Sequence, residues 1–275
     1  MKSSPRVLIL LSDLHVGATA GLLPPGFVTF EGNTVEQNPY QKWLWSCWKD
    51  CWKWTHDVIG KDEWSAVVNG DVIDGVHHET REIISSDAAD HSSAAVELLK
   101  EYLKDASSVY LTEGTNVHVQ NSEHGIASSL RWHGVNVVSP NRRKSAWPEL
   151  DLSIHGACVL VDHHVATSGK SQNASSKFAS TVADIRNRRG AAGWRQPQLI
   201  VRAHAHEFGI WNDGNCTMVV LPPWQGSTRF GRRVVTRAIP KCGIVIADWR
   251  NCTKGEPPVI HHRIHTVDRS NPQFL

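Results

Sequence analysis

Short apolar runs rich in Val, Ile and Leu alternate with longer amphipathic stretches over the first two thirds of the chain. Apolar runs bounded by turn residues predict buried strands, here at 6–12, 67–68, 108–111, 150–155, 157–161 and 199–201. The predicted helices are 39–59, 87–105, 124–132 and 171–189, the last of them polar and exposed. This alternation of strands and helices predicts an α/β protein. With no linker in 275 residues, we expect one domain, 1–275.

The last third of the chain has a different pattern, with short alternating strands and no clear helix. We expect these strands at 208–211, 216–221, 243–249 and 259–267. Because they follow one another in the sequence, they predict a second sheet.

Five of the predicted strands end in a polar segment that carries a carboxylate or a histidine. In chain order, the key residues of these segments are Asp13 and His15, Asp71 and Asp74, Asn116 and His118, His163 and His164, and His204 and His206. Open α/β sheets bind ligands at the carboxyl ends of their strands. A single segment of this kind is often an incidental turn, but five in order indicate a metal centre. Two adjacent metals need a bridging carboxylate, for which Asp71 is the best candidate.

Composition narrows the class of protein. There are 29 basic and 27 acidic residues, a net charge of +2, which argues against a strongly electrostatic nucleic-acid or membrane protein. The sixteen histidines agree with a metal site. None of the six cysteines forms a Cys-x-x-Cys pair, so we expect small core residues rather than a zinc site or a disulfide framework.

In order and spacing, the five polar segments resemble the motifs of the calcineurin-like metallophosphoesterases. That family has Asp-x-His, Gly-Asp-x-x-Asp, Gly-Asn-His-Asp/Glu, a lone His and Gly-His-x-His. The match runs from Asp13 to His206, with Ala203 in place of the first Gly of the last motif. The third motif is Gly-Thr-Asn-Val-His at 114–118, which resembles a variant of phage and bacterial relatives. The resemblance implies a four-layer α/β/β/α sandwich of two mixed sheets flanked by helices.

The resemblance also implies a role for each matching residue and a cofactor of two divalent metal ions, with manganese favoured over iron or zinc. The implied metal ligands are Asp13, His15 and His206 on the first ion, Asp71 as the bridge, and His163 and His204 on the second ion. His164 is the alternative to His163. The second ion is completed by Asn116, Thr115 or a water. The implied catalytic histidine is His118, and Asp74 orients it.

The implied reaction is hydrolysis of a phosphate ester by a hydroxide that bridges the two metals. We favour a phosphodiester of a nucleotide or of DNA over a phosphomonoester or a phosphoprotein. The candidate substrate contacts are Arg229, Arg232 and His78, although all three are equally compatible with a solvated rim. A non-catalytic metal-binding or nucleic-acid-binding scaffold of the same fold is the alternative, because the third motif is altered.

No apolar run approaches the length of a membrane span, and the first apolar run is too short for a signal peptide. The sequence therefore predicts a cytoplasmic protein without a membrane partner, and it makes no prediction for the oligomeric state.

Overall fold

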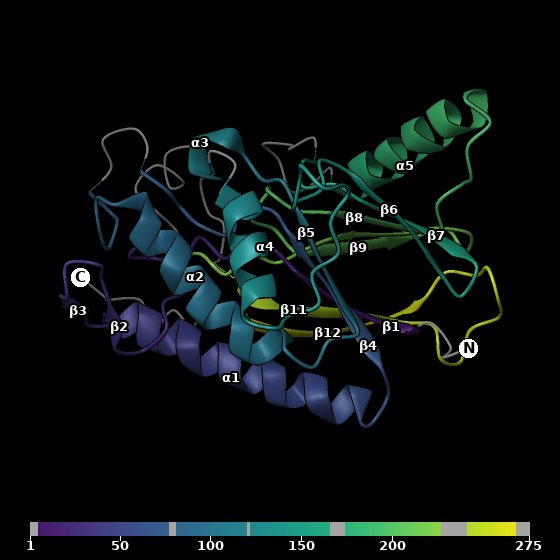
Figure 1. Cartoon of the computed structure of the whole chain (residues 1–275). Coiled ribbons are helices and arrows are strands. Elements are labelled where there is room, and N and C mark those ends of the chain that lie inside the picture. The colour runs from purple at the N-terminus through teal and green to yellow at the C-terminus, as the bar shows by residue number, and fades with distance from the viewer. Residues whose placement is uncertain (1–4, 77–80, 120–121, 166–173, 227–240, 268–275) are drawn as a thin grey trace, which may run out of the picture.

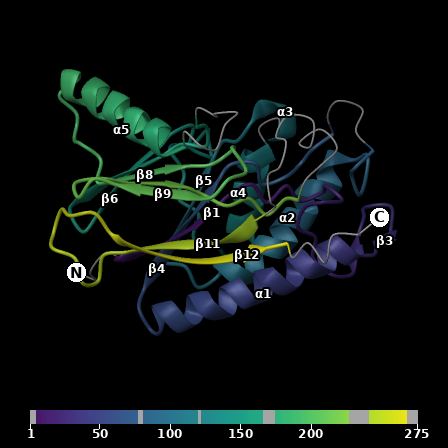
Figure 2. The same cartoon turned by 180° about the vertical axis from the view of Figure 1, so that it is seen from behind.

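Two five-stranded mixed sheets lie face to face between helices in the computed structural model, which describes residues 5–76, 81–119, 122–165, 174–226 and 241–267 (Figures 1 and 2). The helices are α1 (Pro39–Ile59), α2 (Ala88–Leu103), α3 (Asn116–Val119), α4 (Ser122–Trp132) and α5 (Ala174–Ala191). The strands of the first sheet, in spatial order, are β12 (Val259–Thr266), β11 (Lys241–Asp248), β1 (Val7–Leu11), β4 (Trp64–Asn69) and β5 (Ser108–Thr112). Those of the second are β6 (Leu150–Ile154), β7 (Ala157–Val161), β8 (Leu199–Arg202), β10 (Thr217–Val220) and β9 (Gly209–Asn212). A small hairpin joins β2 (Phe27–Val28) to β3 (Thr34–Val35).

Alternation along β1 shows how the sequence builds the layers. Val7, Ile9 and Leu11 face a core shared with α1, α2 and α4. Leu8 and Leu10 face the opposite way, into the core between the two sheets. Successive side chains of a strand point to opposite faces, so a strand covered on both sides is apolar throughout. All five residues of β1 are accordingly buried.

The outer face of the second sheet packs against α5. Ile200 and Met218 of the sheet contact Val182 of the helix in a third, smaller core. Three apolar cores therefore separate four layers, and the predicted α/β/β/α sandwich is confirmed.

The expectation that all the late strands form the second sheet is wrong in part. Strands β9 and β10 join it, but β11 and β12 join the first sheet. β11 lies antiparallel to β1, with Val7 opposite Asp248 and Leu10 opposite Val245. Both faces of β11 are buried, a property that the local sequence does not assign to either sheet.

The carboxyl ends of the parallel strands meet at one edge of the sandwich. β1, β4 and β5 run parallel in the first sheet, and β7 and β8 run parallel in the second. Asn69 Nδ2, at the end of β4, donates a hydrogen bond of 3.2 Å to the carbonyl oxygen of Asp162, which follows β7. The polar segments of both sheets are thereby brought together.

Helix α1 packs beneath the loops at this edge of the sandwich. Its residue Trp48 is fully buried and meets Trp224 at 4.9 Å between ring centroids. Trp224 in turn donates its main-chain N–H to the carbonyl oxygen of Asp13, at 2.8 Å. The tryptophan-rich helix thus fixes the loop after β10 against the end of β1.

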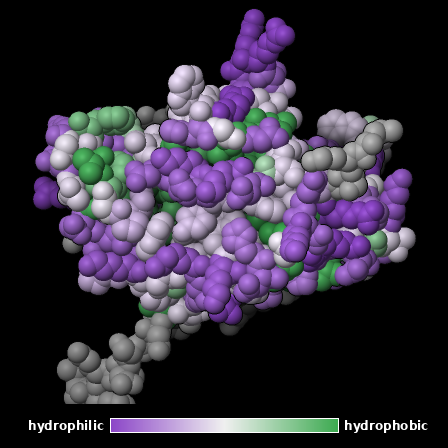
Figure 3. All heavy atoms as spheres, turned by 60° about the horizontal axis from the view of Figure 1, so that its bottom comes forward, coloured by the Kyte–Doolittle hydropathy of each residue, from purple (hydrophilic) through white to green (hydrophobic). Residues whose placement is uncertain are grey.

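In the described part of the chain, no helix combines the length and the apolar character needed to cross a membrane. Figure 3 shows a face on which hydrophilic residues predominate and hydrophobic ones form small, separate patches.

Candidate metal centre

Asp13, His15 and His206 form one group of potential metal ligands, from the ends of β1 and β8. One ligand atom from each lies within 4.8 Å of the others. His15 Nε2 is 3.1 Å from His206 Nε2, and His206 Nε2 is 3.4 Å from Asp13 Oδ1. Two imidazole nitrogens and a carboxylate oxygen that converge in this way suit a divalent cation.

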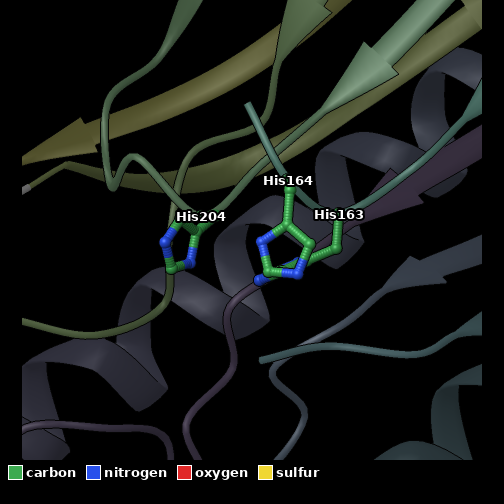
Figure 4. A group of neighbouring side chains, drawn as sticks. All are labelled: His163, His164 and His204. Carbon is green, nitrogen blue, oxygen red and sulfur yellow. The ribbon is translucent and has the colours of Figure 1, made fainter. Parts of the chain in front are cut away.

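His163, His164 and His204 form a second group (Figure 4). Their ring centroids are 5.1–5.4 Å apart, and the rings meet edge to face. His163 is buried, whereas His164 is exposed. The sequence left His163 and His164 as alternatives, but the structure brings both of them to His204.

Asp71 lies between the two groups. Its Oδ2 is 3.0 Å from His163 Nε2 and 3.9 Å from His204 Nδ1 on one side. The same oxygen is 3.9 Å from His15 Nε2 on the other side. This is the position that a bridging carboxylate requires.

The third motif presents Thr115 to this centre. The Thr115 main-chain N–H donates to Asp71 Oδ1 at 2.6 Å, and its hydroxyl lies 3.2 Å from Asp71 Oδ2 and 3.1 Å from His204 Nδ1. Asn116 is exposed at the first position of α3, and no described contact joins it to the centre. Of the two residues predicted as candidates to complete the second site, only Thr115 therefore lies beside Asp71 and His204.

Two buried polar atoms at the centre have no well-aligned hydrogen bond within the described structure: Asp13 Oδ1, which lies 3.4 Å from His206 Nε2, and His163 Nε2, which lies 3.0 Å from Asp71 Oδ2. Buried polar atoms are nearly always satisfied, so these two need another partner. The other ring nitrogen of His163 donates to the carbonyl oxygen of Asn69 at 2.7 Å, which leaves Nε2 as the nitrogen that would bind a metal ion in exchange for its proton. The centre therefore fits bound cations.

Backbone conformation singles out the same residues. In the described chain, six residues other than glycine have positive φ, and five of them are Asp13, His15, Asp71, His204 and His206, at 43–67°. The sixth is His155, which shares the tight turn between β6 and β7 with Gly156. Such conformations cost on the order of 1–3 kcal/mol each and concentrate at functional sites.

Two glycines allow the close packing of these segments. A Cβ on Gly70 would lie 2.5 Å from His163 Nδ1, and one on Gly114 would lie 2.4 Å from Asp71 Oδ1. Any side chain at either position displaces a candidate ligand.

His118 and Asp74 lie beside the first group. Asp74 Oδ1 accepts hydrogen bonds from His15 Nδ1 at 3.0 Å and from Gln225 Nε2 at 3.1 Å. His118 Nδ1 is 3.5 Å from the same oxygen and 3.3 Å from the Asp74 carbonyl oxygen. The structure thus brings the predicted catalytic histidine to its predicted partner. The His118 side chain is 24% exposed.

The electrostatics of the centre favour cations. Burial alone would raise the pKa of Asp13, but the close approach of His206, at 3.4 Å, and the charges of His163 and His206 lower it to about 2. Burial would lower the pKa of His163, yet the adjacent Asp71 and Asp13 raise it to about 9. Asp74 and Asp71 likewise outweigh burial and raise the pKa of His118. The neighbouring histidines also lower the pKa of Asp71, so Asp13 and Asp71 are both ionised at neutral pH and their field stabilises positive charge.

Two residues that support the centre, Asn69 and Gln225, were not predicted from the sequence. Asn69 is visible in the sequence as a polar break at the end of an apolar run, a signal that points to a cross-sheet contact once two sheets are expected. Gln225 lies in a loop more than 150 positions after Asp74, and no local signal links the two. The proposed substrate contacts His78, Arg229 and Arg232 lie outside the described residues.

No family model and no curated protein matches the chain. Several solved structures are similar to it at low identity. One is Vacuolar Protein Sorting 29 from Cryptosporidium parvum, with 11% identity, a TM-score of 0.43 and coverage of 95% of this chain and 98% of that one. A novel archaeal phosphodiesterase has 9% identity, a TM-score of 0.42 and coverage of 95% and 99%. A predicted phosphoesterase from Streptococcus pneumoniae has 8% identity, a TM-score of 0.36 and coverage of 96% and 98%.

The resemblance to calcineurin-like metallophosphoesterases extends from the motifs to the fold. It rests on the four layers and on the meeting of all five motif segments at one edge of the sandwich.

Proposed function

We propose that the chain is a dinuclear-metal phosphoesterase that hydrolyses phosphodiesters. The observation that carries this proposal is the position of Asp71 Oδ2, within 3.9 Å of ligand nitrogens from both groups. A carboxylate shared by two groups of His and Asp ligands is the arrangement of two-metal hydrolytic sites.

The residues suited to hold the ions divide between the two groups. Asp13, His15 and His206 would hold one ion and His163 and His204 the other, and Asp71, which lies between the two groups, would be shared. Bound divalent ions supply Lewis acidity and lower the pKa of water, which makes a nucleophile available at neutral pH.

The part played by the protein itself centres on His118. Its raised pKa keeps more of the imidazole protonated near neutral pH, so that it can donate a proton to the leaving oxygen of the ester. Asp74 holds His118 from one side and Gln225 holds Asp74 from the other. The ring of His118 stands edge-on to His15 at 4.9 Å, which places the acid next to the first group.

A basic loop supports a substrate with more than one phosphate. Lys144 lies 3.3 Å from Glu113, the residue before Gly114, and Arg142 and Arg143 beside it are exposed. Because Glu113 adjoins the third motif, the loop is positioned next to the centre. Positive side chains there favour the extended backbone of a nucleotide or nucleic acid.

The test compares hydrolysis of bis-(p-nitrophenyl) phosphate with that of p-nitrophenyl phosphate, with Mn²⁺ or Zn²⁺ added to the wild-type protein. We expect the diester to be cleaved faster, and Asp71→Asn to abolish turnover of both esters. Asp57→Asn, an exposed position on α1, is the matched control and retains wild-type rates. Faster cleavage of the monoester moves the assignment to a phosphomonoesterase. Bound metal without cleavage of either ester refutes the enzymatic proposal and favours a scaffold.

A further inference from the structure

The second group contains one histidine more than the resemblance requires. The family motif implies a single histidine before the final pair, whereas Asp162-His163-His164 supplies two, and both reach His204. The three centroid distances, 5.2, 5.4 and 5.1 Å, form a nearly equilateral triangle (Figure 4).

The extra histidine accompanies an altered third motif. Where the family has an asparagine ligand, the residue that faces Asp71 and His204 here is Thr115. A neutral threonine hydroxyl is a poorer donor to a divalent ion than an amide oxygen. The second site thus lacks one good oxygen ligand and has one additional imidazole beside it.

We propose that His164 is a ligand of the second metal together with His163 and His204, and that this three-histidine site selects zinc-like ions over Mn²⁺. The proposal rests on the dinuclear site proposed above but does not depend on phosphoester hydrolysis.

The His164 ring lies close enough to the other two histidines to share a metal ion with them. Its ligand nitrogen lies within 4.8 Å of those of His163 and His204. Nitrogens that share one tetrahedral ion at about 2.0–2.1 Å lie about 3.4 Å apart, so a small ring movement closes the site. Within the described residues the His164 ring contacts the rings of the other two histidines, and its side chain is exposed.

The donor set determines the preference. Imidazole suits zinc, copper, iron and nickel, whereas carboxylate, carbonyl and water oxygens suit manganese and magnesium. The first group offers a mixture of carboxylate and imidazole from Asp13, His15 and His206, and it shares Asp71. The second offers three imidazoles and the shared Asp71. The two sites therefore differ in selectivity, in contrast to the manganese pair expected from the resemblance.

The test measures metal binding by the full-length chain after removal of bound metal with a chelator. Zn²⁺ and Mn²⁺ are titrated separately in competition with a chromophoric chelator, and the bound metal is counted by mass spectrometry. His164→Ala is compared with wild type and with His133→Ala, an exposed histidine after α4 that is remote in sequence from every motif.

For wild type we expect two equivalents of zinc. In His164→Ala we expect the zinc affinity of the second site to fall by more than about 100-fold, because loss of a residue that only supports a ligand costs roughly 10–100-fold. The zinc affinity of the first site should not change. Affinity for Mn²⁺ changes little in this variant, and His133→Ala behaves as wild type. Equal zinc affinity of His164→Ala and wild type at the second site overturns the proposal.

A double variant tests the metal preference in the opposite direction. Thr115→Asn in the His164→Ala background restores an amide oxygen and removes the extra imidazole, so we expect the second site to gain affinity for Mn²⁺ relative to Zn²⁺. An unchanged ratio contradicts the assigned selectivity. All these measurements are independent of turnover. If zinc binding depends on His164 but the protein cleaves no ester, the proposed function is refuted and the assignment of His164 as a ligand is retained.

Discussion

His163 Nδ1 donates a hydrogen bond of 2.7 Å to the main-chain carbonyl oxygen of Asn69, and this bond joins the two sheets at the metal centre. The donor follows β7 of the second sheet, and the acceptor ends β4 of the first. A histidine that donates through one nitrogen presents the other as a ligand in a fixed orientation. The contact between sheets is therefore also what aims His163 Nε2 at Asp71.

The Asn69 side chain should be important for stability and for metal binding. Asn69→Ala leaves the Thr112 hydroxyl and the Asp162 carbonyl oxygen without their present partners at a buried position. We expect the free energy of unfolding to fall by about 1–3 kcal/mol, measured by urea denaturation, and zinc affinity to fall with it. Asn136→Ala, which removes an amide from an exposed position, is the control. A similar small loss in both variants would show that the contact between the sheets is dispensable.

Some elements of the fold and the site could be predicted from the sequence alone, and others could not. The run Leu8–Leu11 and the segment after it were predictable because burial on both faces and a polar strand end are local properties. The partner of β11 was not, because antiparallel pairing of Leu10 with Val245 spans more than two hundred residues. The sequence also could not decide whether Thr115 or Asn116 completes the second metal site. The answer depends on the residue at which α3 begins, because a shift of one residue changes which side chain faces Asp71.

Gly114 should be intolerant of any side chain. Gly114→Ala places a Cβ 2.4 Å from Asp71 Oδ1 and 2.2 Å from the Asp71 main-chain nitrogen, so the carboxylate or the loop must move. We expect a loss of about 1–3 kcal/mol in unfolding free energy and the loss of at least one metal equivalent.

The matched control is Gly125→Ala within α4, where a Cβ meets nothing within 4 Å. Alanine there should stabilise the helix by about 0.5–1 kcal/mol. Metal content counted by mass spectrometry decides the point: full loading of Gly114→Ala contradicts the packing argument.

The pH dependence of diester hydrolysis should report His118. If its protonated form is the acid, activity falls as pH rises through the pKa of His118, which lies above the usual value because of Asp74 and Asp71. Asp74→Asn removes one of these charges, lowers that pKa and shifts the alkaline limb to lower pH. The measurement is kcat against pH at saturating metal, with metal content checked in each variant. An alkaline limb that stays in place in Asp74→Asn separates His118 from the proton transfer.

Glu123 provides a prediction about stability that does not depend on catalysis. It lies in the first turn of α4, fully buried, and within the described structure neither carboxylate oxygen has a well-aligned hydrogen bond, although the main-chain N–H groups of Glu123 and Gly114 lie near it. Burial, with the negative charge of Asp71, raises its pKa from 4.5 to about 8. Between these two values the folded chain retains a proton that the unfolded chain releases. The free energy of unfolding therefore falls as pH rises through this window, by about 1.4 kcal/mol per pH unit from this group, and levels off above about pH 8.

Glu123→Gln keeps the shape of the neutral acid and cannot ionise, so the variant should lose this dependence on pH. The difference in unfolding free energy between Glu123→Gln and wild type should grow in favour of the variant from pH 5.5 to pH 8, as measured by urea denaturation. Taking the difference removes the pH dependence of groups that both proteins share. Glu97→Gln, at an exposed position of α2, should track wild type throughout. A constant difference between Glu123→Gln and wild type across this range would mean that Glu123 is already ionised in the fold, with a cation close enough to stabilise its charge.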